Sequence, residues 1–367
     1  MTGRAGLYVH VPFCLTRCGY CDFNTYAGLD HLAGRYAEAL QAEARLASSD
    51  WTGETFGSIF LGGGTPTMLP PATMDALLRS LRGTFDLSPE AEVTSEANPD
   101  TVDEPYLSAL LGAGVTRLSL GLQSFDLRVL EALERIHSPD SARRAHAAAR
   151  AAGFTNVNLD LIYGAEGESL DSWERTLREA LAMRPEHLSC YALTIEPATP
   201  LGRKVEAGLV PAPDPDLQAD MYDIACEVLR GGGYRHYEVS NWALPGFECL
   251  HNLGYWEERP YLGLGAGAHS YRDGRRWWNV RPPQQYLAEV EAGRLPIGGD
   301  EHLSEDERRT ERIFLGLRAR GVAAAEIDPD ALDPFVADGL AERVDGRVTL
   351  TDRGMLLANE VVLALVR

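Results

Sequence analysis

Three cysteines near the N-terminus have the residue type and spacing that point most directly to chemistry. Cys14, Cys18 and Cys21 lie within eight residues of one another, so their thiolates can converge on one metal centre. A structural zinc ion normally takes four protein ligands, and His10 is a candidate for the fourth. Three cysteines can instead hold a [4Fe–4S] cluster in which one iron has no protein ligand. The spacing favours the cluster.

The free iron of such a cluster could chelate the amino and carboxylate groups of a small molecule. If that molecule were S-adenosylmethionine, an electron from the cluster could cleave its sulfonium. The chain has three further cysteines. Cys190 and Cys226 lie in strand and helix patterns, and we expect both to be small buried apolar residues. Cys249 is a candidate soft ligand.

Polar and glycine-rich residues follow the ends of the predicted strands. The strands cover residues 7–13, 58–62, 92–96, 117–122, 156–162 and 187–194, with helical patterns near 31–48, 71–83, 103–113, 126–135, 139–152 and 169–183. This alternation predicts a parallel α/β sheet, either a partial barrel or an open doubly wound sheet. Chemistry in such folds gathers at the carboxyl ends of the strands. The residues at those ends are Cys14, Gly62 to Pro66, Glu96, Asn98, Gln123 and Asp160.

The pattern changes after residue 210, where three prolines precede a helical stretch at about 216–231. We predict a first domain over residues 1–210, an aromatic and glycine-rich extension over 211–300, and a small helical module over 301–367. The last module contains a hairpin pattern, LAERVDGRVTLT, that is typical of a winged helix. The whole chain has a net charge of −20, and this module has more acidic than basic residues, so we expect no nucleic-acid partner.

Residues 1–6 carry no apolar signal core, and no run of about 18 apolar residues occurs. We therefore expect a cytoplasmic protein whose cysteines are thiols, metal ligands or catalysts rather than disulfides. Contact with a membrane-bound acceptor stays open.

The segment YVHVPFCLTRCGYCDF (8–23) resembles the radical SAM proteins of the coproporphyrinogen oxidase class. Further similar segments are GGGTP (62–66), SEANPD (95–100), RLSLGLQSF (117–125), LERIHS (133–138) and NLDLIYG (158–164). The resemblance implies a partial (β/α)6 radical SAM barrel, followed by a smaller C-terminal module of winged-helix-like character. It implies a [4Fe–4S] cluster on the three cysteines. It also implies that S-adenosylmethionine contacts Tyr8, Tyr20, Gly63, Gly64, Thr65, Glu96, Gln123, Arg135 and Asp160.

The sequence departs from the family pattern in one loop. The family has Gly-x-Pro-Gly-Gln after the fifth strand, whereas this chain has GAEGE over residues 164–168. Losing the proline should loosen this turn. We therefore assign no S-adenosylmethionine contact to the loop.

Two relatives share the N-terminal motif. The oxygen-independent coproporphyrinogen III oxidases have a fourth cysteine two positions after the third, where this chain has Phe23, and a long arm ahead of the first strand. The heme chaperones called HemW have the motif His-Asn-x-x-Tyr-Trp. This chain matches that motif at His251, Asn252, Tyr255 and Trp256.

The second resemblance implies a protein that binds heme and passes it to acceptor hemoproteins. His251 could be an axial ligand of the heme iron, with Cys249 as a second ligand, and the aromatic pair could cover the porphyrin. We expect His10 and His269 to be structural. The rival hypothesis is a radical enzyme that acts on a porphyrinogen, and the third is a purely structural zinc or iron–sulfur protein.

Overall fold

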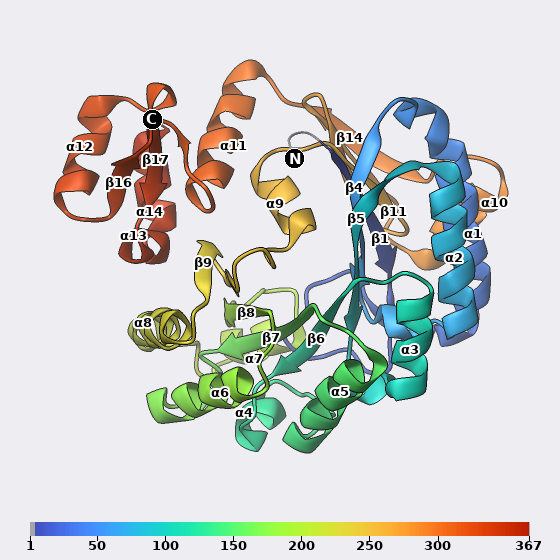
Figure 1. Cartoon of the computed structure of the whole chain (residues 1–367), viewed down its shortest axis with the longest axis horizontal. Helices are drawn as coiled ribbons and strands as arrows, with labels where there is room; N and C mark the ends of the chain where they lie inside the picture. The colour runs from blue at the N-terminus through green and yellow to red at the C-terminus, as the bar shows by residue number, and fades with distance from the viewer. Residues whose placement is uncertain (1–3, 367) are drawn as a thin grey trace.

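The computed structural model describes residues 4–366, and its centre is a curved sheet of twelve strands. All six predicted strands are present, and they pair side by side in parallel. They are β1 (Ala5–Val11), β4 (Thr55–Gly63), β5 (Asp86–Ala97), β6 (Arg117–Gln123), β7 (Val157–Tyr163) and β8 (His187–Ala192). The predicted α/β fold is confirmed, and the sheet is an open, partial barrel (Figure 1).

The predicted helices cover the outer side of this sheet (Figure 1). They are α1 (Ala33–Ala47), α2 (Pro71–Thr84), α3 (Glu104–Gly112), α4 (Leu127–Ala132), α5 (Pro139–Ala152) and α6 (Leu170–Ala182). Side chains at the N-caps of four of them accept a backbone N–H bond: Asp103, Asp126, Ser138 and Ser169. Short 3-10 helices lie at Asp30–Leu32, Ser48–Trp51, Pro66–Met68, Pro99–Thr101 and Ala324–Glu326.

Residues beyond 230 extend the same sheet at both edges. Strand β11 (Tyr261–Leu264) pairs with β1 in parallel, and β12 (His269–Arg272), β13 (Arg275–Asn279) and β14 (Ile297–His302) follow it antiparallel. At the other edge, β10 (Asn241–Ala243) and β9 (Arg235–Glu238) continue antiparallel from β8. The sequence did not predict these strands, because segments of three to six residues are too short to show a clear alternation of apolar and polar side chains.

The extension also contributes helices. They are α8 (Pro215–Gly231), α9 (Leu250–Trp256) and α10 (Pro283–Glu291), whereas α7 (Pro200–Glu206) precedes the extension. Helix α9 packs against β4 and β1 from the inner side of the curved sheet (Figure 1). In the part of the chain that the structure describes, no helix has both the length and the apolar character that a membrane crossing requires.

The C-terminal module contains α11 (Glu305–Leu317), α12 (Pro329–Ala337), α13 (Asp352–Leu356) and α14 (Ala358–Leu365). A three-stranded antiparallel sheet joins them, with β17 (Arg347–Leu350) between β15 (Val322–Ala323) and β16 (Ala341–Val344). Strands β16 and β17 form the predicted hairpin. The likeness to a winged helix stays a prediction.

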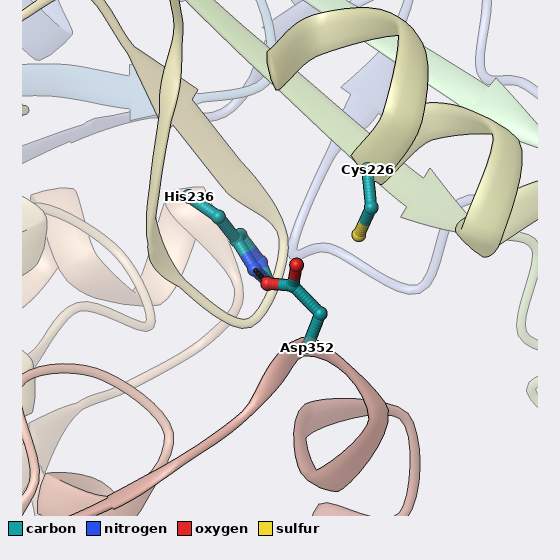
Figure 2. Close-up of side chains that lie close together, drawn as sticks. All are labelled: Cys226, His236 and Asp352. Atoms are coloured by element: carbon teal, nitrogen blue, oxygen red, sulfur yellow. Dashed lines mark hydrogen bonds and ion pairs between the residues drawn. The ribbon is translucent and has the colours of Figure 1, made fainter.

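A cluster of polar side chains joins this module to the barrel. Figure 2 shows Cys226 of α8, His236 of β9 and Asp352 of α13 pointing toward one another, and their ligand atoms lie within 4.8 Å. The Nδ1 atom of His236 lies 3.0 Å from an Asp352 carboxylate oxygen, and Arg230 pairs with the same carboxylate. The set has donor types that zinc accepts. Because Arg230 already balances the carboxylate, we interpret the set as a docking contact.

Candidate functional site

A cavity of about 340 Å³ lies where the cysteine loop covers the carboxyl ends of the parallel strands. Most of the predicted site residues line it together, although they come from five strands and their loops. They are Cys14, Cys18, Cys21, Tyr20, Gly63, Gly64, Thr65, Glu96, Gln123, Arg135 and Asp160. Among the predicted S-adenosylmethionine contacts, Tyr8 lies instead in an adjoining cavity.

Two two-residue strands bracket the cysteine loop and hold it over the sheet. Strand β2 (Phe13–Cys14) pairs in parallel with β3 (Tyr26–Ala27). The Thr65 N–H donates to the Phe13 carbonyl at 2.8 Å, which ties the loop to the segment after β4. Burial raises the pKa of the Cys14 thiol to about 11 and also raises that of Cys21. A metal centre here would therefore have to displace thiol protons.

The geometry of the three thiols argues against a single zinc ion. Among residues 4–366, their sulfur atoms do not form a group within 4.8 Å of one another. Tetrahedral zinc with bonds of about 2.3 Å needs sulfur atoms about 3.8 Å apart. Moreover, His10 has no free ring nitrogen, because Nδ1 lies 3.0 Å from the Tyr8 hydroxyl and Nε2 lies 2.9 Å from the Asn24 carbonyl. The wider spacing fits a multinuclear cluster.

The glycine segment after β4 allows a close approach to the cysteine loop. A methyl group on Gly64 would lie 2.6 Å from the Phe13 carbonyl oxygen, so only glycine fits. Gly63 has a φ of 108°, a conformation that side chains other than glycine rarely adopt. Its N–H donates to the Glu96 carboxylate at 3.1 Å. The segment thus brings its backbone to the cavity wall, beside the Glu96 carboxyl group.

Two buried carboxyl groups form one wall. Burial and the nearby charge of Asp160 raise the pKa of Glu96 to about 8. Burial also raises the pKa of Asp160, which accepts a hydrogen bond from the Ser119 hydroxyl at 2.8 Å and one from the Asn158 amide at 2.9 Å. These bonds fix the carboxylate, and both groups could accept from hydroxyls or an ammonium group of a ligand.

Two polar atoms of the site are buried without a hydrogen-bond partner in the described chain. They are Oε1 of Gln123 and Nε of Arg135. Gln123 has a φ of 65° at the end of β6, a strained conformation of the kind found at functional sites. The other nitrogens of Arg135 contact the Cys18 sulfur, the Asn98 amide oxygen and the Gly121 carbonyl. Unpaired buried groups carry an energetic cost that a polar ligand would relieve.

Asn98 was expected at the end of its strand, and the structure gives it a contact within the site, while Ser119 and Tyr191 are additions that the sequence did not predict. Asn98 bridges Arg135 and the Thr65 hydroxyl, while Ser119 and Tyr191 line the cavity. Asn98 and Ser119 lie inside the SEANPD and RLSLGLQSF segments, which resemble the family, so their place in these segments could have predicted that they belong to the site. The GAEGE loop lines a different cavity, where the Glu168 carboxylate accepts the Gly164 N–H at 2.8 Å.

The motif at 251–256 forms helix α9. His251 is buried, and both of its ring nitrogens have partners: Nδ1 lies 2.9 Å from the Ser58 hydroxyl and Nε2 lies 2.9 Å from the Tyr255 hydroxyl. Asn252 and Trp256 are partly buried. Cys249 is fully buried beside Glu92, and burial raises the pKa of its thiol to about 12.

A second and larger cavity, of about 840 Å³, lies between α9, α11 and the strands β11 to β13. We call it the aromatic cavity. It contacts the cysteine loop through Phe23, a residue that lines both cavities and whose side chain is 64% exposed. Its wall contains six aromatic side chains: Tyr8, Phe23, Tyr255, Tyr261, Tyr271 and Trp278.

Comparison with known proteins agrees with this arrangement. The family model for the Radical SAM superfamily matches residues 8–180, and that for the HemN C-terminal domain matches residues 303–357. Heme chaperone HemW of Mycobacterium tuberculosis is 45% identical over 97% of this chain and 93% of its own length. The chain belongs to the HemW family. HemW of Bacillus subtilis is 35% identical over 96% of this chain, and HemW of Escherichia coli is 34% identical over 97%.

The solved structure of coproporphyrinogen III oxidase (HemN) from Escherichia coli, a radical SAM enzyme, covers 99% of this HemW family member with a TM-score of 0.85 and 25% identity. The match covers 90% of the oxidase chain. The predicted radical SAM barrel with its C-terminal module is therefore confirmed. The oxidases have a fourth cysteine two positions after the third. This HemW family member has Phe23 at that position, and the Phe23 side chain is exposed.

Proposed function

We propose that this chain is a heme chaperone, which binds heme and transfers it to acceptor hemoproteins in the cytoplasm. The observation that carries the proposal is the 45% identity, over 97% of the chain, to a protein named heme chaperone HemW. The match of the motif at 251–256 and the presence of Phe23 in place of a fourth cysteine support the same function. The net charge of −20 argues against a nucleic-acid partner.

We further propose that Cys14, Cys18 and Cys21 hold a [4Fe–4S] cluster and that the 340 Å³ cavity binds S-adenosylmethionine. Bound together, these groups would supply an open iron site and a sulfonium that one electron can cleave. The residues of the chain bind and orient the ligand. Glu96 and Asp160 can accept from its ammonium and hydroxyl groups, and Arg135 can pair with its carboxylate.

The 840 Å³ aromatic cavity supports heme as the cargo. Its volume lies within the range of cofactor and ligand pockets, and its aromatic walls offer flat apolar surface to a porphyrin. This cavity adjoins the cluster site at Phe23, which lines both cavities.

The alternative is an oxidase that acts on coproporphyrinogen III, and the similarity to the HemN structure favours it. The two functions are separated by one preparation of the anaerobically reconstituted protein. Heme is titrated while the Soret band is followed, and coproporphyrinogen III is added with S-adenosylmethionine while porphyrin products are measured. We expect saturable heme binding, transfer of heme to an apo-hemoprotein and no turnover. Turnover to protoporphyrinogen, or no heme binding, would overturn the chaperone function.

A further inference from the structure

Three histidines lie in or beside the aromatic cavity, and they differ in whether their ring nitrogens are free. His10 uses both nitrogens in bonds to Tyr8 and Asn24. His251 uses both in bonds to Ser58 and Tyr255. A heme iron needs the lone pair of an unengaged, neutral imidazole nitrogen. Neither of these residues offers one without breaking a buried or partly buried hydrogen bond.

The third histidine, His269, is different. It begins β12, lines the cavity and is exposed. No residue between 4 and 366 forms a hydrogen bond with its ring. The ring lies against Trp278 of the neighbouring strand, with ring centres 5.7 Å apart and planes inclined by 29°. Burial and the nearby charges of Arg276 and Arg281 lower the pKa of His269, so its imidazole is neutral near pH 7.

The same cavity has groups suited to the rest of a heme. Tyr255, Tyr261 and Tyr271 lie on its wall together with Trp278 and provide apolar surface for the macrocycle. Arg276 and Arg281 lie on the same wall. Arg276 is already paired with Glu301 and Glu311. Arg281 is exposed and forms no ion pair within residues 4–366, so it is available to a propionate.

From these contacts we propose that heme binds in the aromatic cavity with His269 as the axial ligand of its iron and Arg281 as a partner of a propionate. This inference rests on the proposed heme-binding function and assigns its site. Heme binding at this site involves ligation alone: a lone pair of the neutral imidazole forms a bond to the iron, and no electron is transferred.

The motif at 251–256 then has an indirect role. His251 lines a smaller cavity of about 180 Å³ on the far side of Tyr255, and Tyr255 lines both cavities. The bond between His251 and the Tyr255 hydroxyl fixes the tyrosine ring on the cavity wall. His251 is therefore a positioning residue.

The test compares heme titrations of the full-length wild-type, His269→Gly and His251→Gln proteins, followed by Soret absorbance and by the spin state of the ferric iron. In His269→Gly we expect the affinity for heme to fall at least about 10-fold and the histidine-ligated spectrum to disappear. Added imidazole should restore that spectrum, because it can occupy the space left by the side chain. His251→Gln should weaken binding but retain the spectrum of the wild type.

His302→Ala is the matched control, since His302 is an exposed histidine on the nearby strand β14. It should bind heme as the wild type does. An unchanged spectrum in His269→Gly, or loss of the histidine-ligated spectrum in His251→Gln alone, would overturn the assignment of His269. If the wild type itself bound no heme, the proposed function would fail instead. Arg281→Gln should lower affinity about 3- to 10-fold with an unchanged spectrum, as expected for one charge-assisted bond.

Discussion

Beside the cysteine loop, buried polar atoms of Gln123 and Arg135 have no hydrogen-bond partner among residues 4–366, whereas His10 and His251 beside the aromatic cavity use both ring nitrogens. The two regions belong to one sheet and meet at Phe23. The contrast teaches that residue type alone does not show which side chain can bind a metal or another ligand. A polar group that already has its partners stabilises the fold, and one left unpaired in a cavity is available to a ligand.

The largest expected effect comes from a cysteine substitution that should affect the cluster site but not the aromatic cavity. Cys14→Ala should abolish the sulfur-to-iron charge-transfer absorbance and most of the bound iron, because a cluster held by three thiolates loses one of them. Heme affinity should stay within about 3-fold of the wild type, since no cysteine of residues 4–366 lines the aromatic cavity. Absorbance and iron analysis measure the first effect, and a heme titration measures the second.

Cys190→Ala is the control for this variant, since Cys190 is buried and lines neither cavity, so this protein should keep its iron. An equal loss of heme and iron in Cys14→Ala would show that the two regions are not separate sites.

The next effect concerns the tight contact between the glycine segment and the cysteine loop. Gly64→Ala would place a methyl group 2.6 Å from the Phe13 carbonyl oxygen, so the segment must shift. We expect the affinity for S-adenosylmethionine, measured by calorimetry on the reconstituted protein, to fall at least about 10-fold. The control is Gly83→Ala in α2, where the added methyl group meets no atom within 4 Å. Unchanged affinity in Gly64→Ala would contradict the close approach.

A smaller effect should appear in the pH dependence of stability. The pKa of Glu96 is raised from 4.5 to about 8, so the folded protein holds this proton more tightly than the unfolded chain. Its contribution to stability is therefore complete below about pH 4.5 and is lost as the pH rises through about 8. Glu96→Gln should flatten the fall in Tm of the apoprotein between pH 5 and pH 8, as measured by calorimetry.

The matched control for this variant is Glu38→Gln, which changes an exposed carboxyl on α1. It should leave the pH dependence of Tm as in the wild type. A slope in Glu96→Gln that equals the wild-type slope would argue against a protonated Glu96 in the apoprotein.

The smallest effect concerns the docking contact of the C-terminal module. Asp352→Asn removes the charge that pairs with Arg230, and because the two side chains are 34% and 66% exposed, the loss should be about 1 kcal/mol or less. Urea unfolding measures this loss, and hydrogen exchange in α8 and β9 should increase. Asp333→Asn breaks the pair with Arg343 inside the module and should leave exchange in α8 and β9 unchanged.

Much of the site beside the cysteine loop could be predicted, because short sequence motifs contain its residues. The spacing of the three cysteines and the polar residues after each strand predicted that these side chains meet at one edge of the sheet, and they line one cavity there. The extension was harder. Strand β11 has four residues and pairs with β1, which lies more than 250 residues earlier in the sequence. No short-range sequence pattern therefore predicts it.

The sequence by itself determined which residue types could ligate and which strand ends would meet, because parallel strands connected by helices bring their carboxyl ends to one edge. Only the tertiary structure decided which histidine is free. The partner of His251 at Ser58 is 193 positions away, and Trp278 beside His269 comes from the next strand. Availability for ligation depends on which hydrogen bonds are already made, and those bonds form only when distant segments pack together.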